Sequence, residues 1–190
     1  MVNFQLWLER TLSNVDPVAT FMRTRWGWPA VESVHFIGLT LLFGVIAAWD
    51  LRLLGVAKRV PIVAFHRLVP FAVLGFAINA TSGSMFLMTE PDQYLYNRAF
   101  HFKLLFIALA GLNVAVFYLA VFRRLSGLAP GVAAPHAVKV FGATSLICWI
   151  AVIVCGRLIT WYRPDLCDPS EAIGFLADCI LRYPTLAPTP

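Results

Sequence analysis

Residues 26–55 read WGWPAVESVHFIGLTLLFGVIAAWDLRLLG, and this stretch decides the fold. From position 30 to position 49 its only charged residue is Glu32, close to the start. About 20 residues of this kind are needed for a helix to cross the hydrocarbon core of a bilayer, which is roughly 30 Å thick. The stretch therefore predicts a transmembrane helix, and tryptophans mark its ends at the expected membrane interfaces: Trp26, Trp28 and Trp49.

The composition of the whole chain agrees with a membrane protein. The chain has 190 residues, of which 59% are hydrophobic and 13% are charged, and its mean hydropathy is +0.75. A soluble domain is about 45–50% apolar and 25% charged. The net charge is +5, but the basic residues lie beside apolar helices, where they orient a membrane protein. We therefore expect a lipid bilayer around the chain and no nucleic-acid partner.

Three further apolar stretches have the length of a membrane span, and they cover residues 61–89, 97–122 and 137–162. Pro70 lies inside the first of them and predicts a kink. Asn113 lies in the middle of the next and predicts a hydrogen bond to a neighbouring helix. The expected fold is all-α: a four-helix transmembrane bundle over residues 26–162, with residues 90–92 as one short loop.

Short amphipathic segments flank the expected bundle at both termini. Residues 1–25 carry too many charges for a signal peptide and predict interfacial helices, one of which begins at Asp16. Residues 163–190 form a C-terminal tail that contains a second amphipathic stretch, at 171–181, and a Pro-rich end that is expected to be disordered. We therefore expect short interfacial helices at both termini.

Basic residues predict the orientation in the membrane, because short cytoplasmic loops carry an excess of Lys and Arg. The two loops that join the first helix to the second and the third to the fourth hold, with their flanks, seven basic residues: Arg52, Lys58, Arg59, Arg67, Arg123, Arg124 and Lys139. Their only acid is Asp50, whereas the other side holds eight basic residues and nine of the ten acids. The expected location is a bacterial inner membrane, with both termini periplasmic.

The four cysteines fall into two pairs. Cys167 and Cys179 lie in the tail, which is periplasmic in this topology, where disulfides persist. The sequence allows two alternatives for this pair: a disulfide, or two free thiols. Cys148 and Cys155 lie seven residues apart on one face of the fourth helix and are expected to pack there.

The four histidines are the main candidate functional residues, and there is one for each helix: His35, His66, His101 and His136. His35 and His101 lie within about two turns of the outer starts of helices one and three, and thus at similar depth. His66 and His136 lie near the inner side. Two pairs near opposite faces are the pattern by which a bundle holds haem b between facing imidazoles.

Two other features near the outer pair fit haem. Gly38 and Gly44 follow His35 and predict room for a flat macrocycle. Lys103 and Arg157 emerge at the outer face, where haem propionates need cations. The alternative for each histidine pair is a hydrogen-bonded pair that only stabilises helix packing.

A copper site is the second hypothesis. Met85 and Met88 lie three residues apart near the outer face, level with His35 and His101. Thioethers and imidazoles together suit Cu(I). The alternative is that both methionines only pack.

Several motifs resemble a family of small, uncharacterised bacterial four-helix inner-membrane proteins: WPAVESVHFIGLTLLFG with DLRLLG, the FHFKLL start of the third helix with Asn113, and Trp149 with Arg157 in the fourth. More distantly, His35 with the H-x-K pattern of His101 and Lys103 is similar to HemJ-type protoporphyrinogen oxidases. The KLL start of the third helix with Asn113 is similar to CopD-type copper-resistance membrane domains. The likeness to HemJ-type proteins implies b-type haem on His35 and His101, and the likeness to CopD-type domains implies copper handling.

Three functions remain as hypotheses. The first is a haem b subunit of a membrane oxidoreductase that moves electrons between quinone and a periplasmic partner. The second is a copper-handling membrane protein. The third is a structural subunit of a larger membrane complex, without a cofactor. The sequence contains no Walker loop, nucleophile elbow or zinc motif, and it indicates no catalytic residue.

Overall fold

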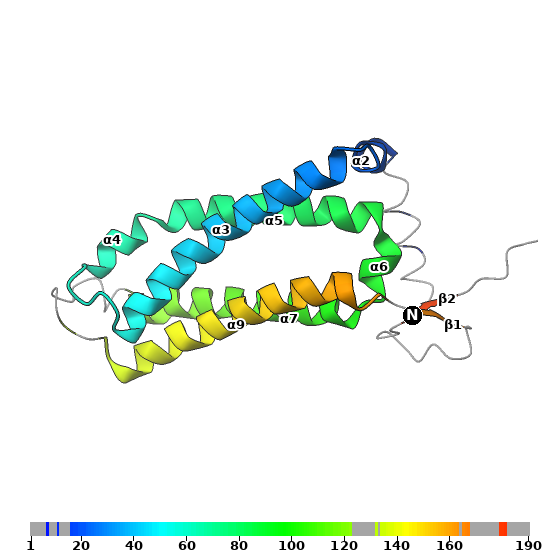
Figure 1. Ribbon diagram of the computed structural model, residues 1–190. Helices are drawn as coiled ribbons and strands as arrows, with labels where there is room; N and C mark the ends of the chain where they lie inside the picture. Colours follow the sequence, from blue (N-terminus) through cyan, green and yellow to red (C-terminus); the bar gives the residue numbers. More distant parts are fainter. Residues whose placement is uncertain are drawn as a thin grey trace, which may run out of the picture.

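The computed structural model describes residues 7, 11, 16–122, 132 and 134–163, together with the backbone of 165–167 and 179–181. Its helices include four spans that are long and apolar enough to cross a membrane: Gly27–Leu54, Ile62–Thr89, Arg98–Val121 and His136–Trp161. The four predicted spans are therefore confirmed (Figure 1). Large apolar side chains cover their outward faces, as a bilayer requires, for example Phe36, Leu105, Leu112 and Ile147.

The first span is helix α3, Gly27–Leu54, and a short helix α2, Asp16–Met22, precedes it. Helix α3 ends where Gly55 takes a left-handed φ of 108°. The amides of Gly55 and Val56 both donate to the carbonyl of Leu51, at 3.1 and 2.9 Å, which satisfies the helix end. Helix α2 begins at Asp16, the residue at which the sequence predicts a second interfacial segment to start, and its place at the membrane interface stays a prediction. The remaining N-terminal segment lies outside the described residues, apart from Trp7 and Thr11.

The second span is interrupted just before Pro70, the residue at which the sequence predicts a kink. It consists of α4, Ile62–His66, and α5, Val69–Thr89. Pro70 occupies the first turn of α5, where its missing N–H costs no helical hydrogen bond. The interruption therefore falls at residues 67 and 68, because a helix tends to end before a proline.

The connection to the third span differs from the prediction. Pro91–Leu95 form a short helix, α6, instead of a loop. Proline suits the first helical position and Asp92 suits the positive end of the helix dipole. The third span follows as α7, Arg98–Val116, and continues as a π-helical turn, η1, Phe117–Val121.

The fourth span is α9, His136–Trp161, and the tail after it contains two strands, β1, Asp165–Cys167, and β2, Cys179–Leu181. The strands pair in parallel. The prediction of a helix is therefore wrong for the last three residues of 171–181, because they satisfy their backbone on β1; the other eight lie outside the described residues.

The strand register bears on the tail cysteines. It sets Cys179 opposite Asp165 and Cys167 opposite Leu181, so the two cysteines are two positions out of register. Strand spacing and rise then separate their Cα atoms by about 8 Å. A disulfide spans roughly 4.4–6.8 Å between Cα atoms. The disulfide remains a prediction, and this register favours its alternative.

The four spans pack in the order α5–α3–α9–α7. Figure 1 shows α3 lying along α5, with α9 and α7 as the second pair beneath them. Glycines allow close approach: a Cβ on Gly75 would lie 2.6 Å from the Leu42 nitrogen, and one on Gly142 3.0 Å from the Asp50 carbonyl. The seam between α5 and α7 carries no packing of comparable extent among the described residues.

The two ends of the bundle are distinct. One end holds α2, α6 and the last turn of α9, and we refer to it as the α6 end (Figure 1). The other holds residues 55–61, α4 and the start of α9, and we refer to it as the α4 end. The Asn113 amide donates to the Phe141 carbonyl at 3.1 Å, so the predicted hydrogen bond between helices is confirmed and joins α7 to α9.

Candidate functional site

The candidate site is built around His35, half-buried on α3 toward the α6 end. Its Nδ1 lies 2.8 Å from the Ser82 hydroxyl on α5. Ser82 is itself buried, at 3% exposure. The Phe86 ring lies edge-on to the imidazole at 5.7 Å, one turn further along α5. His35 is therefore held between α3 and α5 by one polar contact and one aromatic contact.

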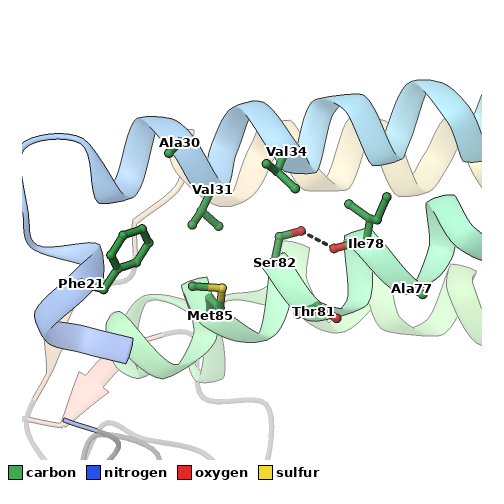
Figure 2. A pocket seen from close by; sticks show the side chains of 9 residues that line it. All are labelled: Phe21, Ala30, Val31, Val34, Ala77, Ile78, Thr81, Ser82 and Met85. Atoms are coloured by element: carbon green, nitrogen blue, oxygen red, sulfur yellow. Dashed lines mark hydrogen bonds between the residues drawn. The ribbon is translucent and has the colours of Figure 1, made fainter. Parts of the chain in front are cut away.

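The hydrogen bonds of Ser82 determine which ring nitrogen of His35 carries the proton. The Ser82 hydroxyl donates to the Ile78 carbonyl at 2.6 Å, which uses its only hydrogen (Figure 2). With its hydrogen on Ile78, Ser82 accepts from His35, and this is the arrangement in which Nδ1 bears the hydrogen and Nε2 keeps its lone pair. This is the tautomer that binds a metal, because ligating histidines donate their other N–H to a fixed acceptor.

Lys103 belongs to the surroundings of His35. It interacts electrostatically with His35 and with the Cys155 thiol. Its Nζ lies 3.6 Å from where a Cβ on Gly156 would be, so the glycine leaves space for the ammonium against α9. Lys103 is thus directed toward α9.

His101 lies on a different face of α7 from Lys103. A helix turns about 100° per residue, so side chains two positions apart differ by about 200°. With Lys103 directed at α9, His101 faces the α6 side, where it interacts with the Leu95 backbone and its ring lies 6.4 Å from Phe100. The structure therefore places Lys103 and His101 on different faces of α7, with Lys103 on the face toward α9.

The structure also separates the two predicted propionate partners. Arg157 is exposed on α9, and its Nη1 donates to Thr160 at 3.4 Å. Lys103 lies against Gly156 of α9, whereas Arg157 is exposed. Residues 156 and 157 of one helix face directions about 100° apart, and the role of the two cations as propionate partners stays a prediction.

The second histidine pair is not assembled at the α4 end. The His66 Nδ1 lies 3.1 Å from the Tyr118 hydroxyl, and the imidazole is flanked by the rings of Trp49 and Phe122 at 6.3 and 4.8 Å. His136 is exposed at the first position of α9. His66 therefore sits in an aromatic cluster, and His136 stands outside it.

The two glycines expected to make room for a macrocycle do not do so. A Cβ on Gly38 would lie 2.6 Å from Ile78, so this position is filled by α5. Gly44 meets nothing within 4 Å and is exposed. Gly38 serves the close approach of two helices, and that interpretation of the sequence is corrected.

A shallow apolar groove of about 430 Å³ lies between α2, α3 and α5 (Figure 2). Val34 and Met85 line it, and His35 does not. Met85 also packs against a buried cluster formed by Met22, Val31 and Phe86. Packing, the alternative considered for the methionines, therefore describes Met85.

Two site residues were missed by sequence reasoning. Ser82 lies in the polar run NATSGS at 79–84, which indicated close helix packing but not a partner for His35. Asn97 is 3% exposed and caps α7, accepting from the Ala99 amide at 2.9 Å. Its amide nitrogen donates to the carbonyls of Ile159 and Tyr162. Asn immediately before an apolar stretch is a helix-start signal that could have identified this residue.

Among the residues that the structure describes, no three His, Cys, Asp or Glu side chains gather as a metal site would require. Comparisons with families of known proteins, with curated proteins and with solved structures found no match. The function is therefore argued from the His35 site alone.

Proposed function

We propose that this chain is a haem b-binding membrane protein in which His35 is an axial ligand of the iron. The observation that carries the proposal is the hydrogen bond from His35 Nδ1 to Ser82, because it leaves Nε2 as a free lone-pair donor inside a membrane-embedded bundle. A bound haem would supply one-electron chemistry. The protein would then be an electron-transfer subunit between quinone and a partner on the α6 side.

The residues near His35 suit such a group chemically. Lys103 provides one ammonium that can pair with a propionate. Phe86 gives His35 an apolar neighbour, and burial of this kind tunes a haem potential. The seam between α5 and α7, which the described helices do not pack closely, borders the same end of the bundle.

The second axial position is assigned separately. His101 is the histidine at the same end of the bundle, and we propose it as the other ligand. Its place on a different face of α7 makes it the weaker half of the pair. We further propose that the α6 end is periplasmic, from the distribution of Lys and Arg.

The proposal is tested by the absorption spectrum of detergent-purified protein expressed with a haem precursor. Wild type is expected to show reduced haem b bands, and His35→Ala is expected to lose or shift them while still inserting. His136→Ala is the matched control, because that histidine is exposed at the other end. His101→Ala then decides whether α7 supplies the second ligand.

Two outcomes would overturn the assignment. Unchanged bands in His35→Ala, with loss in His66→Ala, would move the site to the α4 end. Wild-type protein without haem would reject it altogether, and metal analysis would then separate the copper hypothesis from a cofactor-free subunit.

A further inference from the structure

A second buried ionisable group lies far from His35, at the α4 end. Asp50 belongs to α3, four residues before the helix ends, and is only 3% exposed. It therefore lies inside a span that the bundle places in the membrane. Acidic residues in such positions are rare, and they mark functional sites by default.

The close approach of α3 and α9 buries this carboxyl. Gly142 lets the two helices touch, since a Cβ there would lie 3.0 Å from the Asp50 carbonyl and 3.1 Å from Leu53. Ser145, one turn further along α9 and 4% exposed, hydrogen-bonds to the Asp50 carboxyl. The other carboxyl oxygen, Oδ2, is buried without a hydrogen-bond partner.

The carboxyl makes no ion pair within the described residues. Arg52, on the same helix, donates its Nε to the Val60 carbonyl at 2.8 Å and its Nη2 to the Lys58 carbonyl at 3.1 Å, and its Nη1 is buried without a hydrogen-bond partner. The other charged or titratable side chains described at this end are Lys58 and Arg59 between α3 and α4, His66 and Arg67 at the end of α4, His136 and Lys139 of α9, and Tyr118 of η1. Helix α5 contributes none.

Two physical terms oppose a negative charge at this place. An unpaired ion that is removed from water costs several kcal/mol. The C-terminal end of a helix carries a partial negative charge, which further disfavours a carboxylate near the end of α3. One serine hydroxyl is too little to offset both terms, whereas a neutral acid avoids them.

We propose that Asp50 is a proton-binding site, held as the neutral carboxylic acid inside the bundle and exchanging its proton with the α4 side. Four residues of helix place it about 6 Å from the end of α3, so the path to the α4 surface is short. The site can take up or release one proton within the membrane, at the opposite end from His35. It does not depend on haem.

Infrared spectroscopy of the purified protein at neutral pH tests this inference. We expect a C=O stretching band of a protonated carboxylic acid that disappears in Asp50→Asn. Glu32→Gln is the matched control, because Glu32 is an exposed acid on the same helix, and it should leave the band unchanged. Absence of an Asp50-dependent acid band would overturn the proposal.

Two further measurements keep the test decisive. Ser145→Ala should move the band to higher frequency, because a hydrogen bond lowers the frequency of a C=O stretch. An unchanged band in Ser145→Ala would count against the assignment. This test remains available if Asp50→Asn fails to insert. Transfer to heavy water should shift the band, since an exchangeable proton is replaced by deuterium. A band that does not shift would mean a locked acid and no exchangeable site.

Discussion

Single hydrogen bonds decide the chemistry available to His35. The Ser82 hydroxyl has one hydrogen, and when it donates this hydrogen to the Ile78 carbonyl, the imidazole donates to Ser82 from Nδ1. Other hydroxyls on α5 make the same bond to the carbonyl four residues earlier without meeting a partner helix, as Ser84 does at 2.8 Å. Ser82 is therefore the residue that orients His35, and Ser84 is its natural control.

The first prediction concerns this orientation and rests on the proposed haem site. Ser82→Ala removes the acceptor for Nδ1–H and releases both the tautomer and the ring orientation. Loss of such a supporting bond typically costs about 10–100-fold in affinity at a metal site, and we expect haem retention to fall accordingly. Haem-to-protein ratios after purification measure it. Ser84→Ala should match wild type; an equal loss in both variants would contradict a specific role for Ser82.

The second prediction concerns Tyr94, which lies in α6, outside the spans. Burial, with the nearby Glu90 and Glu32 charges, raises the pKa of Tyr94 to about 12 from its usual 10.0. The folded state thus holds this proton more tightly than the unfolded state, so the stabilisation is complete below pH 10 and is lost as pH rises toward 12. The melting temperature of Tyr94→Phe should therefore fall less steeply with rising pH across this range than that of wild type. Identical alkaline slopes in both proteins would show that Tyr94 does not carry the effect.

At the scale of elements, the junctions between helices rest on a few buried contacts. Asn97 caps α7 and also binds the end of α9, through the Ile159 and Tyr162 carbonyls at 3.1 and 2.7 Å. Gly75 sits where α5 crosses α3, and a Cβ there would meet backbone atoms that cannot move aside. These positions set how the helix pairs are joined.

Asn97 has two functions that substitutions can separate. Asn97→Asp keeps the oxygen that accepts from Ala99 but loses both donated bonds, whereas Asn97→Ala loses everything. We expect about 1–3 kcal/mol of destabilisation from the stranded carbonyls in Asp, and about 1 kcal/mol more in Ala from the lost cap. Unfolding of purified protein in denaturing detergent measures both. Equal stability of Asn97→Asp and wild type would show that the link to α9 contributes little.

Glycine substitutions test the helix crossing. Gly75→Ala should destabilise the bundle by about 1–3 kcal/mol, because overpacking against a backbone forces the helices apart. Gly44→Ala and Gly111→Ala meet no atom within 4 Å. They should leave the bundle unchanged or slightly more stable, since alanine favours helix. The same unfolding assay ranks the three, and a Gly75→Ala protein as stable as Gly44→Ala would refute the close crossing.

At the scale of the whole molecule, helix α2 and the last turn of α9 both lie at the α6 end, because four spans return the chain to the side where the first span began (Figure 1). The α4 end and its flanks hold seven basic residues and one acid, and that one acid is Asp50, buried in the bundle. The exposed charge at this end is therefore wholly basic among the residues that the structure describes. This fits a cytoplasmic α4 end.

The topology prediction follows from this asymmetry. A C-terminal alkaline phosphatase fusion should be active, since the enzyme folds only in the periplasm, and a C-terminal green fluorescent protein fusion should be dark. The reverse pair of results would invert the orientation and place His35 toward the cytoplasm. It would leave the hydrogen bond between His35 and Ser82 intact.

The sequence by itself determined the four apolar helices and a break in regular helix near Pro70. Hydrocarbon demands a minimum length of apolar helix, and proline lacks a donor, so both leave a direct trace in the order of residues. The sequence does not show in the same way which face of each helix packs against its neighbours. A helix surrounded by lipid is apolar on all sides, so no stripe of apolar residues separates inside from outside. Only the tertiary structure decided that Ser82 meets His35, that Lys103 lies against Gly156 of α9, and that Asp50 meets Ser145.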